Sequence, residues 1–354
     1  MNKDLGVVII GATGYGAGEL LRLLLNHSRA EVVGLISSSN AGACVGDAHP
    51  QLEGLYDLKL SSTIDFSLLS RYRRAVVFAG LPHGVSATAI SGLLSDLPED
   101  LKASDRFTLI DLSGDFRIKD LSVHEQFYSA SSLFPEIRSE FVYGLSELNR
   151  KSIETARLIS NPGCFATACI LAAAPMVASG ACSKIIFDAK TGISGAGRSV
   201  TEVTHFPSRY SNFSAYKVLE HRHEPEIVEG LSLAGSGHLE TTFIPHLLPV
   251  SRGIFVTAHM SLDRDVPQEL LEQSYKGFYA GCPFVRVRSV SPEIGHVIGT
   301  NFFDVSVKVR GKDVVVMGAL DNLVKGMAGQ AIQNMNLACG LDQRDGLWHG
   351  PIFP

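Results

Sequence analysis

The first third of the chain alternates short apolar runs with amphipathic stretches. Val7 to Ile10 is apolar and precedes a glycine-rich turn, leucines spaced along one face of a helix, and a second apolar run over 31–36. This β–α–β succession places two strands parallel to each other. Further apolar runs at 75–79 and 107–112 end in small or polar residues, as strands do at the ligand edge of an open parallel sheet. We expect an α/β fold with an N-terminal Rossmann-like doubly wound domain.

The second half of the chain has a different pattern. An alanine-rich run over 165–177 predicts a buried helix, and the segments after it alternate apolar and polar residues only partially. They predict an α+β domain with a mixed sheet. The domain boundaries are predicted at 1–160 for the Rossmann domain, completed by a C-terminal helical segment 322–354, and at 161–321 for the second domain. The strands predicted in this half are 184–189, 253–260, 284–290, 302–309 and 313–320.

Composition narrows the class of protein. The chain has 354 residues, of which 45% are hydrophobic and 19% charged, which fits two globular domains. The formal net charge of -5, without runs of Lys or Arg, argues against nucleic acid or a membrane surface as partner. The N-terminus has no pattern of a targeting segment, so we expect a cytoplasmic protein. Six cysteines without CxxC pairs indicate reduced thiols and no metal site.

One of these cysteines lies in chemically distinctive surroundings. Cys164 follows the turn sequence Asn161-Pro162-Gly163 and directly precedes the predicted helix. Unpaired amides and the positive end of the helix dipole at such a position stabilise a thiolate, the nucleophilic form of cysteine. The alternative is a buried core cysteine, which is the fate expected for Cys169 inside the same helix.

The glycine-rich turn after the first strand predicts a dinucleotide site. Gly11, Gly14 and Ala17 form a GxxGxxA spacing between a strand and a helix, where backbone amides can reach a pyrophosphate. The alternative is a glycine turn that only packs the helix on the strand. After the second strand stand Ser37, Ser38, Ser39 and Asn40, without the acidic residue that would hold the ribose of NAD, so NADP is favoured.

Two histidines offer a proton carrier. His221 and His223 are two residues apart, so in an extended segment both would face the same side. A metal ligand pair is one interpretation, but no recognisable metal motif accompanies them. A general acid or base beside a nucleophilic cysteine is the better interpretation, because imidazole titrates near neutrality. We favour His223 over His221 for this role.

A second small-residue loop predicts an anion site. Thr191 to Ser199 follows a strand and combines glycines and hydroxyls with Arg198, groups that bind phosphate or carboxylate. The alternative is a flexible loop with a solvated arginine. Two further strand ends, 111–117 and 249–253, contribute Arg117 and Arg252 as weaker candidates.

Taken together, these motifs resemble the N-acetyl-gamma-glutamyl-phosphate reductases, which are relatives of the aspartate-semialdehyde dehydrogenases. The resemblance covers almost the whole chain, and SNPGC with HRHEPEI is its most distinctive part. The matching segments are 11–20, 81–84, 111–117, 142–147, 160–167, 191–199, 221–227 and 321–326.

The resemblance implies an oxidoreductase of arginine biosynthesis that reduces N-acetyl-L-glutamyl 5-phosphate with NADPH through a cysteine thioester. It implies that Cys164 is the nucleophile, that His223 or His221 is the acid/base, and that the cofactor is NADP(H). Its partners would be the acyl-phosphate or semialdehyde substrate, phosphate, and copies of the chain in a homodimer or homotetramer. The cofactor residues expected from motif and resemblance are Gly11, Thr13, Gly14, Tyr15, Gly16, Ser37, Ser38, Ser39, Pro82, Ser194, Gly195 and Asn322. The substrate residues expected are Asn161, Arg117, Ser194, Gly197, Arg198 and Arg252.

Two other functions stay open on the sequence. A related acyl-phosphate reductase, acting on aspartyl phosphate or on a carrier-bound aminoadipyl substrate, would have a similar anion site. An NADP-binding sensor would need only the glycine loop, and the presence of Cys164, His223 and Arg198 together speaks against it. The family commonly has an arginine where Ser38 stands, which bears on the cofactor preference.

Overall fold

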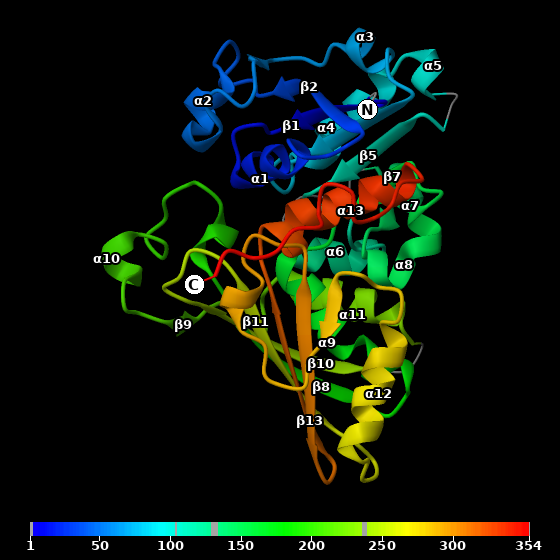
Figure 1. Cartoon of the computed structure of the whole chain (residues 1–354), viewed down its shortest axis with the longest axis vertical. Helices are drawn as coiled ribbons and strands as arrows, with labels where there is room; N and C mark the ends of the chain where they lie inside the picture. The colour runs from blue at the N-terminus through cyan, green and yellow to red at the C-terminus, as the bar shows by residue number, and fades with distance from the viewer. Residues whose placement is uncertain (1–2, 103–104, 129–133, 236–238, 354) are drawn as a thin grey trace. The chain divides into compact units, whose positions relative to one another are not determined.

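The chain forms two structural units, shown in the computed structural model of Figure 1, which describes residues 3–102, 105–128, 134–235 and 239–353. One unit runs up to Pro162 and also includes Met327–Trp348. The other comprises Gly163–Gly326 and the segment from His349 onward. The boundaries predicted from the sequence were 160/161 and 321/322. The segment 322–354, predicted to complete the first domain, is divided between the two units at Gly326/Met327 and at Trp348/His349.

The first unit is built on a parallel sheet. Its strand order is β3-β2-β1-β4-β5-β7-β6, and every neighbouring pair in it is parallel. The order reverses direction on either side of β1, as in a doubly wound sheet, which confirms the predicted class. The strands are β1 (Leu5–Ile10), β2 (Ala30–Ile36), β3 (Leu60–Ser61), β4 (Arg74–Ala79), β5 (Phe107–Asp111), β6 (Val142–Tyr143) and β7 (Leu158–Ser160).

Helices connect these strands. In α1, leucines at helical spacing are buried, whereas Arg22 on the other face is half-exposed. The helices of this unit are α1 (Tyr15–Leu24), α2 (Val45–Ala48), η1 (Pro50–Leu52), α3 (Phe66–Leu69), α4 (Ser86–Asp96), α5 (Glu99–Lys102), α6 (Leu121–Phe127), α7 (Pro135–Glu140), α8 (Ser146–Ile153) and α13 (Gly329–Ala338).

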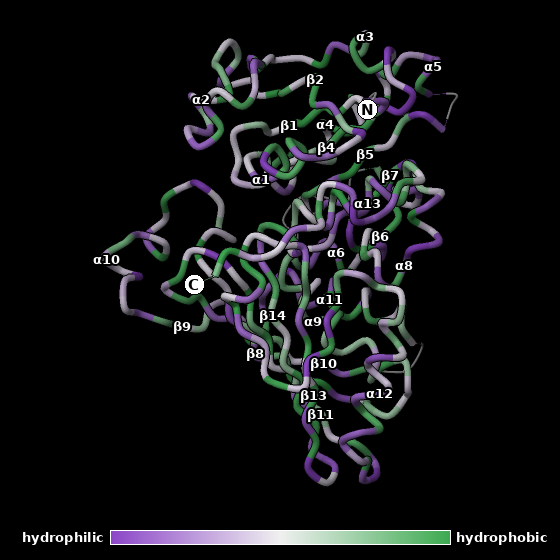
Figure 2. The backbone as a smooth tube through the Cα atoms, viewed as in Figure 1, coloured by the Kyte–Doolittle hydropathy of each residue, from purple (hydrophilic) through white to green (hydrophobic). Residues whose placement is uncertain are grey.

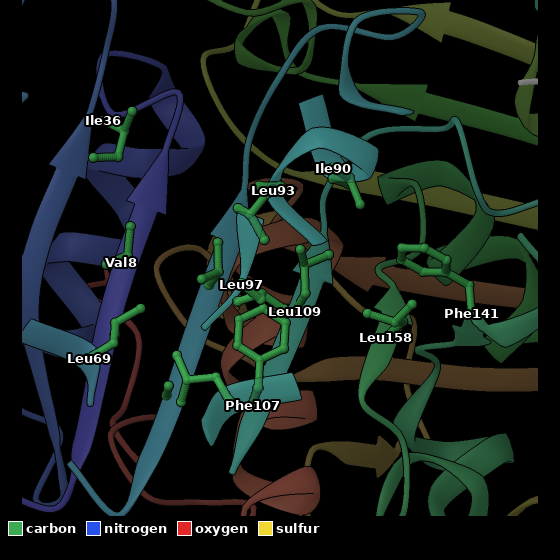
Figure 3. Packing of buried hydrophobic residues seen from close by; sticks show 14 of the residues in the cluster. Val8, Ile36, Leu69, Ile90, Leu93, Leu97, Phe107, Leu109, Phe141 and Leu158 are labelled. Atoms are coloured by element: carbon green, nitrogen blue, oxygen red, sulfur yellow. The ribbon is translucent and has the colours of Figure 1, made fainter. Parts of the chain in front are cut away.

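A hydrophobic core fills one side of the parallel sheet. Side chains of β1, β4 and β5 meet leucines and an isoleucine of α4 there, and Figure 3 shows Ile90, Leu93, Phe107 and Leu109 among the side chains of this cluster. Residues buried on both faces of a central strand explain why these strands appear as continuous apolar runs in the sequence. The core thereby holds the carboxyl ends of β1, β2 and β4 rigidly, where the glycine loop and the serines lie.

The second unit contains a mixed sheet, as predicted. Its strand order is β12-β13-β14-β11-β8-β10-β9. The pairs β12/β13 and β8/β10 are parallel and the other pairs antiparallel. The strands are β8 (Lys184–Thr191), β9 (Ser214–Ala215), β10 (Glu240–Leu247), β11 (Ile254–Ser261), β12 (Val285–Val287), β13 (Phe303–Arg310) and β14 (Asp313–Leu320).

Strand β10 was not predicted, because Pro245 interrupts its apolar pattern. Proline has no N–H to donate to a sheet, so it is confined to sheet edges and similar positions. In β10 the neighbouring strand β9 is only two residues long, and the carbonyl of Pro245 accepts the N–H of Tyr216. Strand β9 pairs only with His246 and Leu247 of β10, so the missing N–H of Pro245 removes no hydrogen bond between these two strands.

Helices cover one face of the mixed sheet. Helices α9, α11 and α12 pack against β8, β10, β11, β13 and β14. On the other face, half-buried or exposed residues alternate with buried ones along β8 and β11. Figure 2 shows hydrophilic and hydrophobic residues succeeding one another along the backbone of this unit. The helical segments of this unit are α9 (Cys164–Ala178), η2 (Ile193–Ala196), α10 (Phe206–Arg209), α11 (His223–Ser232), α12 (Gln268–Phe278) and η3 (Ile294–His296), and a π-helical turn, η4 (Val324–Ala328), runs across the boundary between the units.

Candidate active site

Cys164 is the first residue of α9, which confirms its predicted place at a helix N-terminus. Gly163 is the N-cap, with extended backbone angles (φ -70°, ψ 148°). Cys164 is partly exposed, whereas the residues from Phe165 to Met176 are buried. The first amides of a helix have no partner within it, so they are directed at the region of the thiol. Cys169 is fully buried, and burial raises the pKa of its thiol.

A buried carboxylate, missed in the sequence, fixes the turn before Cys164. Oε1 of Glu226 accepts the N–H of Gly163 at 2.7 Å, and Glu226 is 1% exposed. Glu226 lies on α11, three residues after His223 and therefore on the same helix face. The spacing of an imidazole and a carboxylate one turn apart is the signal that could have revealed it.

The two histidines lie together, although not in an extended segment. His223 begins α11, and Arg222 before it has helical backbone angles. The ring centroids of His221 and His223 are nevertheless 4.7 Å apart, and both side chains are nearly buried. The sequence placed both imidazoles on one side for the case of an extended segment; here the chain enters α11, and the two rings still lie together.

The environment of His221 bears on proton transfer. Burial and the positive charges of Arg222 and Lys217 lower the pKa of His221 to about 3. Nδ1 of His221 accepts the N–H of His223 at 3.1 Å, so its proton resides on Nε2. His221 is therefore neutral through the neutral pH range.

Aromatic rings line this part of the site. Phe165, the residue after the thiol, has its ring 5.8 Å from His221 and 6.1 Å from His223. The ring of Tyr216 lies 5.6 Å from His221. Burial and the negative charge of Cys164 raise the pKa of Tyr216, so this phenol stays protonated beside the thiol. Tyr216 was not predicted, since nothing in its local sequence distinguishes it.

The loop predicted to bind anions packs tightly on the turn between β10 and β11. A Cβ on Gly192 would lie 2.7 Å from the carbonyl oxygen of Ser251 and 2.8 Å from the amide of Arg252, so only glycine fits there. The N–H of Ser194 donates to the same carbonyl of Ser251 at 3.1 Å. Beyond this anchored part, residues 195–199 are exposed, including Gly197 and Arg198.

Asn322 and Asp321 join this loop to the next one. Nδ2 of Asn322 donates to the hydroxyl of Ser194 at 2.9 Å, and Oδ1 of Asn322 accepts the N–H of Gly253 at 2.7 Å. Asp321 is fully buried and pairs with Arg252, whose Nε lies 3.0 Å from Oδ2. The structure thus brings Ser194, Arg252 and Asn322 together within the second unit.

In the first unit, the glycine loop has the geometry of a phosphate cradle. Gly11 has φ +76°, and a Cβ there would lie 2.1 Å from the carbonyl oxygen of Gly80. Gly14 is the N-cap of α1, and Thr13, Tyr15 and Gly16 flank that helix start. Glycine is therefore required at position 11 because the loop packs closely on the backbone after β4. The first amides of α1, which follow Gly14, are the groups that can bind a pyrophosphate.

Two further expected cofactor segments follow strands β2 and β4, which lie on either side of β1 in the parallel sheet. Ser37 is buried after β2, whereas Ser38 and Ser39 are exposed, and the hydroxyl of Ser39 donates to Oδ1 of Asn40. Pro82, also exposed, belongs to the turn before α4. The carboxylate of Asp115 accepts the N–H of Gly84 at 2.8 Å and of Ala87 at 3.0 Å, which holds this turn in place.

Arg117 and Asn161, two expected substrate residues, are buried in the first unit. Nε of Arg117 donates to the carbonyl of Asn161 at 2.7 Å, and Nη2 donates to the carbonyl of Leu112 at 2.8 Å. The side chain of Asn161 bonds with Met327 and Asn334. These contacts stabilise the turn that leads to Cys164, and a substrate contact of either residue stays a prediction.

Two absences hold for the part of the chain that the structure describes. No cluster of three or more His, Cys, Asp and Glu side chains there could hold a metal ion. No helix in the same residues has the length and apolar character needed to cross a bilayer.

Comparison with known proteins identifies the class. Residues 6–156 match the family model of the semialdehyde dehydrogenase NAD binding domain, and residues 164–322 match that of the semialdehyde dehydrogenase dimerisation domain. The fold is similar to that of aspartate semialdehyde dehydrogenase II from Vibrio cholerae, with a TM-score of 0.69 at 14% identity, covering 95% of this chain and 98% of the other. The protein is therefore a semialdehyde dehydrogenase in fold and domain composition.

Sequence similarity narrows this further. The chain is 43% identical to an N-acetyl-gamma-glutamyl-phosphate reductase of Methanocaldococcus jannaschii, covering 98% of this chain and 99% of the relative. It is 42% identical to the reductase of the same name from Bacillus cereus, with the same coverage. The chain belongs to the N-acetyl-gamma-glutamyl-phosphate reductase family.

Proposed function

We propose that the protein reduces N-acetyl-L-glutamyl 5-phosphate to N-acetyl-L-glutamate 5-semialdehyde and phosphate with NADPH, a step of arginine biosynthesis. The main support is the position of Cys164 at the start of α9, together with the packing of two buried histidines against Phe165, the next residue. The identity of the substrate is inferred from two N-acetyl-gamma-glutamyl-phosphate reductases, which are 43% and 42% identical to this chain over 99% of their length.

Cys164 acts as the nucleophile in this proposal. Its sulfur attacks the carbonyl carbon of the acyl phosphate, the bond between that carbon and the phosphate oxygen breaks, and phosphate leaves a thioester behind. Amides at the start of α9 stabilise the thiolate and the negative charge on the carbonyl oxygen. Glu226 holds the Gly163 amide and thereby the turn on which the thiol lies.

His223 handles the proton. After reduction, the thiohemiacetal on Cys164 must lose its hydroxyl proton as its C–S bond breaks, and an imidazole within reach of the thiol can accept that proton. His221 supports this role because its Nδ1 accepts the backbone N–H of His223 and so helps to hold the start of α11 in place.

The anion site serves the phosphate and the substrate carboxylate. Arg198 lies on the exposed part of its loop, and the side chain of Arg252 is 24% exposed beside its partner Asp321. Guanidinium groups bind both kinds of anion with two parallel hydrogen bonds.

The cofactor would be held by the first unit. Gly11, Thr13, Gly14, Tyr15 and Gly16 would hold the pyrophosphate and Ser37, Ser38 and Ser39 the ribose phosphate, with Pro82 as a further expected contact in this unit. The contacts expected of Ser194, Gly195 and Asn322, which belong to the second unit, stay a prediction. NADPH, when bound, supplies the hydride for the reduction.

The partner is proposed to be a second copy of the chain. Residues 164–322 match a dimerisation domain, and α9, α11 and α12 pack on one face of the mixed sheet in the described residues. Ile186 is 37% exposed on the opposite face, and Ile244, Phe255 and Met317 are only half-buried. A homodimer, alone or paired into a tetramer, would remove these apolar side chains from water.

The substrate is tested by assaying phosphate-dependent NADP reduction with two aldehydes. N-acetyl-glutamate semialdehyde should exceed aspartate semialdehyde in kcat/KM by at least about 10²-fold, because a site that binds the acetamido group leaves its polar groups unpaired with the smaller substrate. The reverse ranking would identify an aspartyl phosphate reductase. Turnover of neither would point to a carrier-bound substrate.

The cofactor preference is a separate prediction. NADP should exceed NAD in kcat/KM by at least about tenfold, because no carboxylate in Ser37–Asn40 repels the 2′-phosphate. Ser38→Glu should lower kcat/KM with NADP more than with NAD, and Ser38→Ala, which adds no charge, serves as the control. Equal use of both cofactors by the unmodified enzyme would contradict the serine argument.

A further inference from the structure

The π-helical turn η4 includes Gly326, which packs on Cys164. The N–H of Gly326 donates to the carbonyl of Asp321 at 2.9 Å, an i to i-5 hydrogen bond of the π type. Single π turns are uncommon and occur frequently at functional sites. The sequence pattern had predicted an ordinary helix over 322–337.

Gly326 packs directly on the proposed nucleophile. A Cβ at this position would lie 2.7 Å from the Cβ of Cys164 and 3.2 Å from its Cα. Real Cβ atoms do not approach within 3.0 Å of another heavy atom, so any side chain at 326 would displace the first residue of α9. The backbone of the π turn therefore forms the surface on which Cys164 rests.

Asp321 anchors the same turn. Its Oδ1 accepts the N–H of Leu323 at 2.8 Å and of Val324 at 3.1 Å, and its Oδ2 accepts the N–H of Gly299 at 2.6 Å. The guanidinium of Arg252 completes the environment of this fully buried carboxylate. One side chain thus holds both the turn behind the thiol and the arginine of the anion site.

We propose that Gly326 and Asp321 are positioning residues that fix the Cys164 sulfur relative to the Arg252 guanidinium. A substrate whose anionic group binds Arg252 then presents its acyl carbon to the sulfur in one geometry. This inference rests on the proposed function for the identity of nucleophile and anion ligand. The contacts themselves belong to the second unit and do not depend on the substrate.

The test compares three glycine-to-alanine variants of the full-length enzyme. Gly326→Ala should lower kcat by about 10²-fold, since a shift of the reacting group by about 1 Å costs that much, while KM for NADP changes little. Alkylation of Cys164 by iodoacetamide, followed against pH, should also slow, because the sulfur moves away from the helix amides. A merely structural role would leave alkylation of the folded protein unchanged.

Two glycines of the same unit serve as controls. Gly318→Ala places a Cβ 2.6 Å from the ring of Phe303, so it should lower the melting temperature without changing the alkylation of Cys164. Gly277→Ala, in α12 with open space around it, should change neither.

Asp321→Asn keeps the size of the side chain and removes its charge. It should lower kcat at least about tenfold and raise KM for the semialdehyde, because Arg252 loses its anchor.

Two results would overturn the proposal. One is a folded Gly326→Ala enzyme with kcat and alkylation within threefold of the unmodified enzyme. The other is equal slowing of alkylation in Gly326→Ala and Gly318→Ala, which would indicate a general loss of packing. Failure of the proposed function would look different: the unmodified enzyme would not turn over N-acetyl-glutamate semialdehyde, while the alkylation measurements would still report on the position of the thiol.

Discussion

Replacing Cys164 by serine is expected to lower phosphate-dependent oxidation of N-acetyl-glutamate semialdehyde by at least about 10⁴-fold, the usual cost of removing a nucleophile. A serine hydroxyl at the start of α9 is not ionised near neutral pH, and no base replaces the thiolate. NADP binding, measured by fluorescence or calorimetry, should survive, because the expected pyrophosphate and ribose contacts are in the first unit.

A matched cysteine provides the control for this experiment. Cys282, also partly exposed and in the same unit, should tolerate serine with activity within about twofold of the unmodified enzyme. Appreciable turnover by Cys164→Ser at unchanged NADP affinity would remove Cys164 from the chemistry. Loss of activity in both variants would point to destabilisation of the unit as a whole.

Replacing His223 by alanine is expected to have the second largest effect, about 10² to 10⁴-fold on kcat. His221→Ala should cost less. Because burial and the charges of Arg222 and Lys217 lower the pKa of His221 to about 3, this imidazole stays neutral and does not titrate near neutral pH. His223→Gln should therefore lower kcat more than His221→Gln does.

The same pKa shift predicts a stability effect that separates the two histidines. The pKa of His221 lies below its ordinary value of 6.5, so between pH 6.5 and about 3 the unfolded chain binds a proton that the folded chain does not. Stability contributed by the neutral ring is present above pH 6.5 and is lost as the pH falls. The melting temperature of His221→Gln should therefore fall less on acidification than that of the unmodified enzyme.

The kinetic prediction has its own contradicting outcome. A larger kcat loss in His221→Ala than in His223→Ala would transfer the acid/base role to His221.

The parts of the fold that were predictable are those with a local signal. Strands β1, β4 and β5 are buried on both faces, so each appears as an apolar run that needs no knowledge of its partners. The start of α9 was predictable because Asn-Pro-Gly is strong turn chemistry in any context. Strand β10 was not, since Pro245 is tolerated only through the shortness of its neighbour β9.

The unpredicted parts of the site depend on contacts between distant residues. Glu226 meets Gly163 across 63 positions of the chain, and neither residue alone signals the hydrogen bond. The need for glycine at 326 comes from its packing on Cys164, which is far away in the sequence, whereas the local sequence pattern indicates an ordinary helix. Arg252 was recognised as a candidate anion ligand, but its buried partner Asp321 was not, because the pair forms only when β11 and β14 adjoin.

The central claim is that an acyl group is transferred to the sulfur of Cys164, and mass spectrometry tests it directly. The enzyme is incubated with NADP and N-acetyl-glutamate semialdehyde without phosphate, quenched in acid and digested. The account predicts one N-acetyl-glutamyl group on the peptide that contains Cys164, together with a burst of NADPH equal to the number of active sites. A burst with no adduct on that peptide, or an adduct on another residue, would contradict it.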